Sequence, residues 1–133
     1  MTSVVWFRSD LRVDDNSALN AALEIGEPVI GVFLLADGQW RTHHWGPRKQ
    51  LFVWQHVLAL RTALAARGIA LHIEHAPRLD DAPGALAAFV LHHNARRVLA
   101  NAEYGVDEGA RDRRVAVRLA AHRVKLRVLH DFT

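Results

Sequence analysis

The sequence predicts an α/β fold, a doubly wound parallel sheet of five strands with helices on both faces. Five short apolar runs alternate with four helical patterns, which is typical of a parallel sheet with right-handed crossovers. The first run, Val4–Arg8, is rich in β-branched and aromatic residues, as expected of a central strand buried on both faces. Charged residues follow it directly, so this strand should deliver a polar loop to the sheet edge where ligands of open α/β sheets bind.

The loop after the first strand carries several charges in a short space. Arg8, Asp10 and Arg12 lie within five residues, and they form either an ion-pair network that only shapes the loop or part of a ligand site. Asn16 and Ser17 are N-cap candidates for the first helix. The apolar positions of that helix are Ala18, Leu19, Ala22 and Leu23.

A second buried strand is expected at Pro28–Leu35. The polar and aromatic segment 36–45 reads as a long loop, and long loops in compact α/β domains are more often functional than simple connectors. A helix should begin at Pro47, which suits the first helical position, and end near Gly68.

The second half of the chain predicts three more strands and two more helices. Asp80 or Asp81 should cap the first of these helices, and His93 should lie at its end near the carbonyls and not as a ligand. The other expected elements are strands at Ile69–Glu74, Arg97–Asn101 and Lys125–Leu129 and a helix at Gly105–His122.

Length and composition predict one soluble domain over residues 1–133. The absence of cysteine excludes disulfides and a thiol nucleophile and fits a reducing compartment, so we expect a cytoplasmic protein. No apolar run is long enough to span a bilayer. The formal charge of +3 is compatible with nucleic acid without requiring it, and there is no long basic run.

The common nucleotide-binding fingerprints are absent, so a ligand must be held by side chains and helix ends. The richest candidate site is the loop with Trp40, His43, His44 and Trp45, together with Arg48 on the next helix. Exposed aromatic and imidazole rings stack on planar heterocycles, whereas the alternative is that the tryptophans only pin the loop to the sheet. Adjacent histidines are poorly spaced for joint metal ligation, and we expect no metal site.

A second candidate site follows the fourth strand. Asp107 and Glu108 lie near the start of a helix, where backbone N–H groups stabilise carboxylates. They either cap the helix, with Glu108 and Arg111 paired, or one of them recognises an amino-pyrimidinone edge. Such an edge presents a ring N–H and an exocyclic amine side by side, and one carboxylate accepts from both. The full set is Asn101, Glu103, Tyr104, Asp107, Glu108, Arg111 and Asp112.

The first charged loop also resembles the opening motif of the DNA photolyase/cryptochrome family. The motif reads Trp6-Phe7-Arg8-x-Asp10-Leu11-Arg12-x-x-Asp15-Asn16. Further matches follow in the family's order at Trp40-x-Thr42-His43, Pro47-Arg48 and Tyr104-x-x-x-Glu108-x-x-Arg111-Asp112. The resemblance covers essentially the whole chain and is greatest to the amino-terminal domain of cyclobutane-dimer photolyases. Of the common strand orders 3-2-1-4-5 and 2-1-3-4-5, it implies 3-2-1-4-5, with the loops after the first and fourth strands facing one crevice.

The resemblance implies that this domain holds an antenna chromophore. In members that bind 5,10-methenyltetrahydrofolate, the contacts match His43, Asp107 and Glu108, and Trp45 is expected to help cover the ring. The family usually has Asn at the position of Asp107, and an ionised Asp only accepts hydrogen bonds whereas Asn also donates. In members that bind a deazaflavin or flavin the ligand lies deeper, near the positions of Asp10, Arg12, Arg48, Asn101 and Glu103.

The family's chemistry is light-driven electron transfer from reduced FAD to a cyclobutane pyrimidine dimer, and the resemblance places FAD and damaged DNA in a larger helical domain. That domain is expected to lie outside residues 1–133, so no residue here is expected to be catalytic. The implied partners are the antenna chromophore, the helical domain and, through it, damaged DNA. An uncovered docking face should cause weak self-association. The alternatives are a cryptochrome-type blue-light photoreceptor and a stand-alone nucleotide-binding or interaction module.

Overall fold

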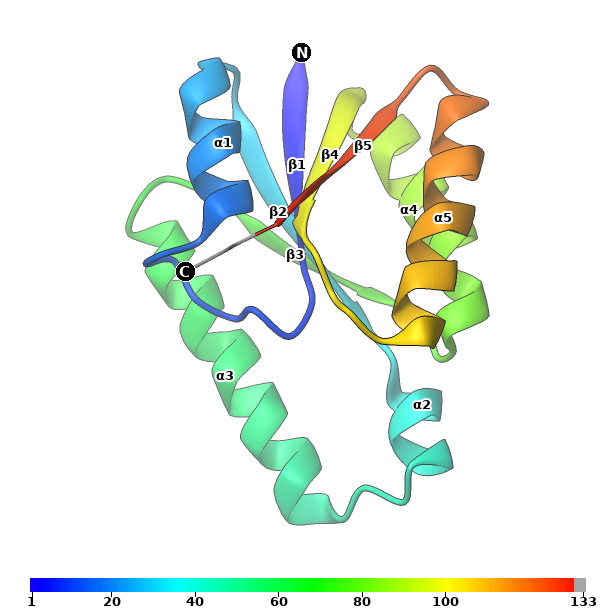
Figure 1. Cartoon of the computed structure of the whole chain (residues 1–133). Helices are drawn as coiled ribbons and strands as arrows, with labels where there is room; N and C mark the ends of the chain where they lie inside the picture. The colour runs from blue at the N-terminus through cyan, green and yellow to red at the C-terminus, as the bar shows by residue number, and fades with distance from the viewer. Residues whose placement is uncertain (131–133) are drawn as a thin grey trace.

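The computed structural model describes residues 1–130 (Figure 1). Strands and helices alternate along the chain, with a short helix and a 3₁₀ turn added to the expected pattern. In order, the elements are β1 (Thr2–Phe7), α1 (Ser17–Ile25), β2 (Val29–Leu35), α2 (Asp37–Thr42), α3 (Pro47–Ala65), β3 (Leu71–His75), η1 (Leu79–Asp81), α4 (Ala82–His92), β4 (Ala95–Asn101), α5 (Val106–Ala120) and β5 (Lys125–Leu129).

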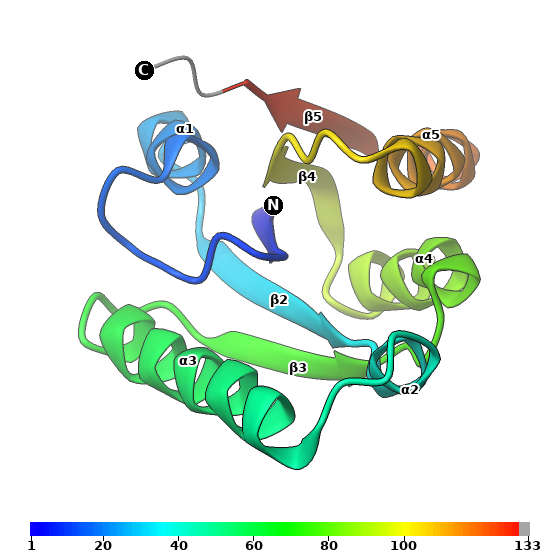
Figure 2. The ribbon, with the colours of Figure 1, turned by 60° about the horizontal axis from the view of Figure 1, so that its bottom comes forward.

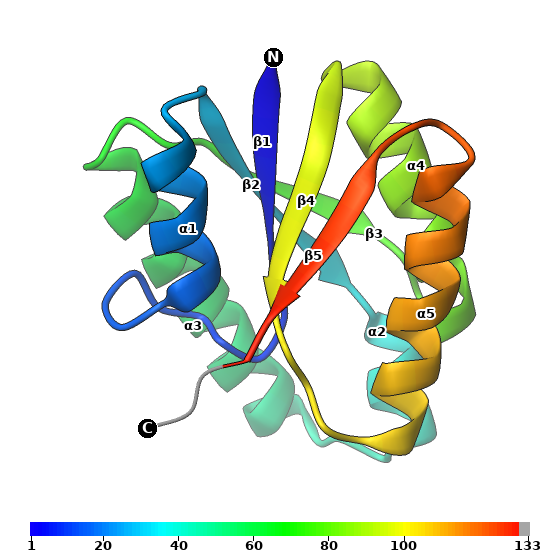
Figure 3. The same ribbon diagram turned by 45° about the horizontal axis from the view of Figure 1, so that its top comes forward.

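The five strands form one parallel sheet in the order β3-β2-β1-β4-β5, which confirms the predicted fold and the order 3-2-1-4-5. Helices α1 and α3 cover one face of the sheet, and α4 and α5 cover the other (Figures 2 and 3). Among the described residues, no helix is both long and apolar enough to cross a membrane.

Strand β1 divides the interior into two cores because its side chains alternate between the faces of the sheet. Val5 and Phe7 belong to the core under α1 and α3, whereas Val4 and Trp6 belong to the core under α4 and α5. Gly31 lies opposite Val5 in the register, and a Cβ there would come within 3.0 Å of the Phe7 ring. The glycine therefore makes room for Phe7 in the middle of the sheet.

Helix α2 lies within the segment predicted to be a loop. This helix packs closely against Pro77, in the segment after β3. That contact explains why the helix forms and why the sequence pattern did not predict it. The Gln39 N–H donates to the Pro77 carbonyl at 2.8 Å, and a Cβ on Gly38 would come within 2.7 Å of that same oxygen. Glycine lowers helix propensity, but only glycine allows this approach, so the tertiary contact decides the conformation.

The other boundaries follow the predictions with shifts of a few residues. The Asn16 cap is confirmed, because its side-chain oxygen accepts the Leu19 N–H at 3.0 Å. Strand β1 ends one residue early because the Arg8 N–H turns to donate to the Asp10 carboxylate at 2.8 Å. Asp81 occupies the position before α4 but accepts from the Arg78 N–H, so its carboxylate closes the 3₁₀ turn instead.

His93 lies at the end of α4, as predicted, in a group of aromatic rings between α4 and the edge strand β3. Its ring centroid lies 4.3 Å from Phe89, 4.6 Å from His72 and 4.9 Å from His92. Burial lowers the pKa of His93, the neighbouring charges of His72 and His92 lower it further, and Glu74 opposes the shift. The folded protein therefore favours the neutral imidazole.

A depressed histidine pKa makes stability depend on pH. Above about pH 6.5, the ordinary histidine pKa, His93 is neutral in the folded and unfolded states. Below it the unfolded chain binds the proton more readily, so the free energy of unfolding should fall as the pH drops through the folded-state pKa of His93. Chemical denaturation between pH 7.5 and 5 should show a shallower fall for His93→Phe than for the wild type. The exposed His122→Gln serves as the control, and equal slopes for His93→Phe and the wild type would contradict the assignment.

Candidate functional site

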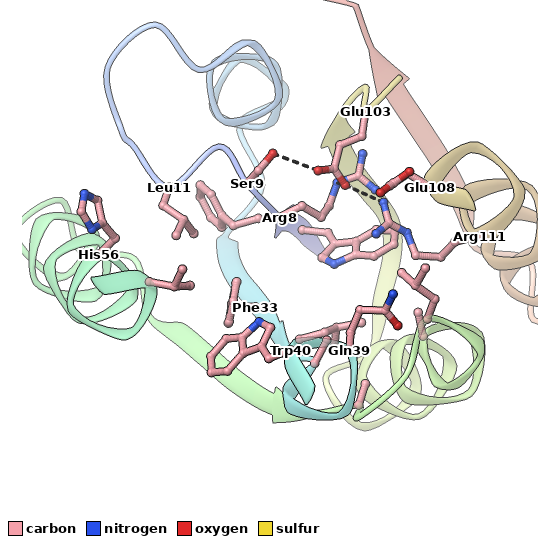
Figure 4. Close-up of a pocket in the computed structure, with 18 of the residues that line it drawn as sticks. Arg8, Ser9, Leu11, Phe33, Gln39, Trp40, His56, Glu103, Glu108 and Arg111 are labelled. Carbon is pink, nitrogen blue, oxygen red and sulfur yellow. Dashed lines mark hydrogen bonds and ion pairs between the residues drawn. The ribbon is translucent and has the colours of Figure 1, made fainter. Parts of the chain in front are cut away.

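A cavity of about 620 Å³ opens at the carboxyl ends of β1 and β2 (Figure 4). Its walls come from the loop after β1, from α2 and α3, and from the start of α5. The volume falls in the range of small-molecule sites. It lies where the sequence predicted a ligand, at the carboxyl edge of the sheet.

One wall of the cavity is aromatic. The rings of Trp40 and Trp45 stack with centroids 5.7 Å apart and planes inclined by 16°. Lys49 comes from the next helix, α3, and its ammonium lies 4.2 Å from the Trp45 ring centroid. Gln39 Nε2 and His43 Nε2 are joined by a hydrogen bond of 2.8 Å. Both predicted ring residues, His43 and Trp45, therefore line the cavity in an ordered wall.

The opposite side of the cavity is a closed ring of two arginines and two carboxylates. Arg8 Nη1 and Arg111 Nε both donate to Asp112 Oδ1, at 2.7 and 3.1 Å. Arg111 Nη2 donates to Glu103 Oε1 at 2.7 Å, and Arg8 Nε lies 3.8 Å from the same oxygen. Arg8 also donates to the Asn101 carbonyl. The exposed fractions of the Arg8, Arg111 and Asp112 side chains are only 5%, 8% and 12%.

Trp6 anchors this ion-pair ring from below. The guanidinium carbons of Arg8 and Arg111 lie 4.4 and 4.9 Å from the Trp6 ring centroid, within the range of cation–π attraction. Two positive and two negative groups are thus held on a buried aromatic surface. The arrangement makes this side of the cavity polar but electrically balanced.

Glu108 stands apart from the ion-pair ring. It is half-buried and lines the cavity, and its side chain forms no hydrogen bond or ion pair with the other described residues. The pair with Arg111, one of the two alternatives for this carboxylate, does not form, because Arg111 binds Glu103 and Asp112 instead. The carboxylate folds back over Gly105, where any Cβ would overlap it. Glycine at the N-cap of α5 therefore leaves room for an available carboxylate at the cavity wall.

Asp10 and Asn101, which the resemblance placed near a deeper ligand, are held in a hydrogen-bond network with Asn16 below the cavity. Asn101 Nδ2 donates to Asp10 at 2.6 Å and to Asn16 at 2.8 Å, and Asn101 Oδ1 accepts the Ala18 N–H at 2.9 Å. These bonds tie the ends of β1 and β4 to the start of α1. Neither Asp10 nor Asn101 lines the cavity.

The remaining predicted site residues divide between the cavity and its surroundings. Arg12 and Glu103 line the cavity, whereas Arg48 is exposed in the first turn of α3 and does not. Asp107 is exposed and faces a second hollow of about 300 Å³ on the other side of Gln39 and Arg78. Asp107 and Glu108 are consecutive on a helix, and the 100° between their side chains separates them. His44 is exposed with a positive φ of 56° and lies outside the cavity.

Comparison with known proteins agrees with this geometry. The family model described as DNA photolyase matches residues 3–133. The chain belongs to the DNA photolyase family. It is 38% identical over 109 residues to the deoxyribodipyrimidine photo-lyase of Vibrio cholerae, which covers 82% of this chain and 23% of that protein.

Solved structures of the DNA photolyase family share this fold. The cryptochrome of Synechocystis sp. PCC6803 superposes with a TM-score of 0.84 and 24% identity over 97% of this chain and 27% of that one. A class III photolyase of Agrobacterium tumefaciens superposes with a TM-score of 0.74 and 28% identity over 97% of this chain and 25% of that one. The chain therefore spans about a quarter of the length of the relatives that it matches.

Several residues of the photolyase-family cavity were not predicted as site residues. Trp6 and Phe33 read as strand core, and only the end of each strand exposes them to the cavity. Phe52 and His56 come from α3, where their spacing of four residues puts an aromatic pair on one helix face. The sequence contained a signal for that pair, because two aromatic rings one turn apart lie outside the apolar face that packs on the sheet.

The hydrogen-bond network of Asn101 is predicted to support the cavity without touching it. Asn101→Ala removes three hydrogen bonds and leaves Asp10 Oδ2 with only the Asn16 amide at 3.4 Å as a donor, so the free energy of unfolding should fall by about 2–3 kcal/mol. Urea denaturation measures the change. The exposed Asn20→Ala in α1 is the matched control and should change stability by less than about 0.5 kcal/mol. A loss at Asn101 as small as that at Asn20 would show that the network contributes nothing.

Proposed function

We propose that this chain is the antenna-binding part of a photolyase-family protein and that its cavity holds a planar chromophore, 5,10-methenyltetrahydrofolate. The observation that carries the proposal is the Glu108 carboxylate, half-buried in the cavity wall without a bonded partner among residues 1–130. A carboxylate desolvated in this way needs donors, and a pterin edge offers a ring N–H and an amine side by side.

The aromatic wall supports a flat ligand. Trp40 and Trp45 present a rigid stacked surface, and His43 lines the cavity beside them. Offset stacking on such rings favours a conjugated heterocycle. A ligand between this wall and the start of α5 would place its ring edge toward Glu108.

Hydrogen-bond chemistry favours the folate over a deazaflavin. The imide edge of a deazaflavin has one N–H between two carbonyls, so it needs protein donors. The guanidinium groups of Arg8 and Arg111 line the cavity, and they are bound to Glu103, Asp112 and the Asn101 carbonyl. Of their buried donors, only Arg8 Nε lacks a hydrogen-bond partner among the described residues. The available group is an acceptor, which matches the pterin.

The role of the whole protein is part of the same proposal. The full-length protein would use the antenna to pass excitation energy to FAD in a helical domain, and the reduced FAD would repair cyclobutane pyrimidine dimers in DNA. No residue of this chain is proposed to be catalytic. The same cavity would serve a cryptochrome-type photoreceptor, because the antenna site is independent of the later chemistry.

The exposed apolar residues near the cavity support a covering domain. Tyr104 and Val106, before and at the start of α5, are 73% and 86% exposed, and Phe52 in α3 is 60% exposed. Trp45, in contrast, is half-buried by its stack with Trp40. The helical domain is proposed to cover the first three residues.

The antenna proposal predicts that removing the Glu108 acceptor weakens folate binding. Glu108→Gln keeps the size of the side chain but replaces one acceptor with a donor, so the affinity for methenyltetrahydrofolate should fall about tenfold to a hundredfold. Three of the four tryptophans line the cavity, so quenching of tryptophan fluorescence gives a direct titration. The control is Asp107→Asn, which should leave the affinity unchanged because Asp107 faces the second hollow. Equal affinity of the wild type and Glu108→Gln would refute the folate assignment, and tighter binding of a deazaflavin would replace it.

A separate prediction concerns the uncovered surface. The 133-residue chain should self-associate weakly, with a Kd of about 0.1–1 mM, because exposed apolar residues near the cavity have no covering domain. The double variant Tyr104→Ser/Val106→Ser should shift sedimentation velocity profiles toward the monomer. Val117→Ser, which removes a valine of the last turns of α5 that is 74% exposed, should not. A wild-type chain that stays monomeric at millimolar concentration would contradict this prediction.

A further inference from the structure

The positive charge of the chain is concentrated in its last helix and strand. Residues 113–130 contain six Lys or Arg and no Asp or Glu. The whole chain carries a formal charge of +3, so the remaining residues together carry −3. The modest net charge of the whole chain therefore conceals a strongly basic final segment.

Four cations of this segment, together with one from β4, form a group that we call the basic edge. Its members are Arg96, Arg118, Arg123, Lys125 and Arg127. All five are exposed, and none of their side chains forms an ion pair or hydrogen bond with the other residues in the described range 1–130. Nearby arginines behave differently, since Arg97 lies 3.5 Å from Glu27 and Arg114 lies 3.0 Å from Asp80. The side chains of the basic edge thus have no acidic partner in that range.

The fold brings these cations to one end and one edge of the sheet. Arg123 lies in the turn between α5 and β5, and Arg118 is in the last turn of α5. Lys125 begins β5 beside Arg97 in the parallel register, and Arg127 points to the same face of the sheet two residues later. Arg96 lies at the same end of β4 but points to the other face, so the cations line the edge from both faces. Figure 3 shows the turn at the end of the sheet where β1 and β4 begin, with β5 as the open edge. The cavity lies at the opposite ends of the strands.

We propose that the basic edge binds the phosphate backbone of duplex DNA without sequence preference. Clustered Lys and Arg on one face are the electrostatic footprint of a nucleic-acid surface. Four of the five cations are arginines, whose planar guanidinium binds phosphate in a bidentate manner. The proposal is independent of the chromophore and distinct from the helical domain that the family resemblance assigns to damaged DNA.

The composition of the surface favours a nucleic acid over a membrane. A helix that lies on a bilayer carries Trp, Phe or Leu beside its basic residues. Within residues 113–130, Val117 is the only large hydrophobic residue that is exposed.

Two purely structural roles would also account for the cations of the basic edge, and an experiment can distinguish these roles from DNA binding. Lys and Arg on an edge strand prevent edge-to-edge pairing, and a cation in the last turn of a helix suits the helix dipole. Neither role requires affinity for a polyanion. The salt dependence of DNA binding therefore tests the proposal directly.

The experiment is a titration of a fluorescein-labelled, mixed-sequence 24-base-pair duplex with the 133-residue chain, followed by fluorescence anisotropy at 50 to 200 mM NaCl. Five phosphate contacts predict a slope of about −4.5 for log K against log salt, and hence about a 500-fold loss of affinity across this range. Arg118→Gln/Arg123→Gln should reduce the slope by about 1.8. Arg118→Lys/Arg123→Lys should keep it, because the charge is retained.

The matched control is Arg48→Gln/Arg61→Gln, which removes two exposed arginines of α3 whose side chains have no partner in the described range and changes the net charge equally. It should keep the wild-type slope. Equal loss in both double glutamine variants would show a diffuse effect of net charge and overturn the proposal. So would the absence of binding at 50 mM salt with 100 μM protein, or competition by polyglutamate as strong as by unlabelled duplex. Circular dichroism verifies that each variant is folded.

Discussion

The arrangement of the site depends on the need to neutralise two buried arginines. Arg8 leaves the central strand at the point where the sheet ends, and its charge cannot stay buried without partners. Glu103 from the loop after β4 and Asp112 from α5 supply them, and Arg111 closes the ring. This ring fixes β1, β4 and α5 relative to one another. Most donors of this ring are satisfied internally, and of its buried donors only Arg8 Nε lacks a hydrogen-bond partner among the described residues. The cavity beside the ring therefore offers a ligand mainly the Glu108 carboxylate and the aromatic wall.

Most of the fold could be predicted from the sequence, because apolar runs and helix signals report burial locally. The Asn16 cap, the apolar β1 and the start of α3 at Pro47 are all local features. The strand order came from the family resemblance, since the residues alone left two orders open. Helix α2 was missed because its cause lies forty residues away, in the contact of Gly38 with Pro77. A propensity argument reads Gly38 as a breaker and has no access to that contact.

The site was predictable in position but only partly in composition. Polar residues after β1 and β4 indicated the correct end of the sheet, and His43, Trp45, Glu108, Arg12 and Glu103 do line the cavity. The sequence does not show which polar groups bind each other. Asp10 and Asn101 have the chemistry of ligand-binding residues, yet both are used in holding α1 against the sheet. Asp107 and Glu108 are equivalent in sequence, and only the rotation of the helix separates them.

The two ends of the sheet are under different electrostatic constraints, and this explains where the charges lie. At the carboxyl end the arginines are buried, so each must be matched by a carboxylate, and the acidic residues of α5 gather in its first two turns. The last turns of the same helix lie at the amino end of the sheet and reach solvent. There water screens each cation, and no carboxylate is required. Helix α5 therefore changes sign along its length. Its first half supplies charges to the balanced ion-pair ring beside the cavity. Its second half carries a surplus of positive charge, and this charge lies too far from the cavity to affect ligand binding there.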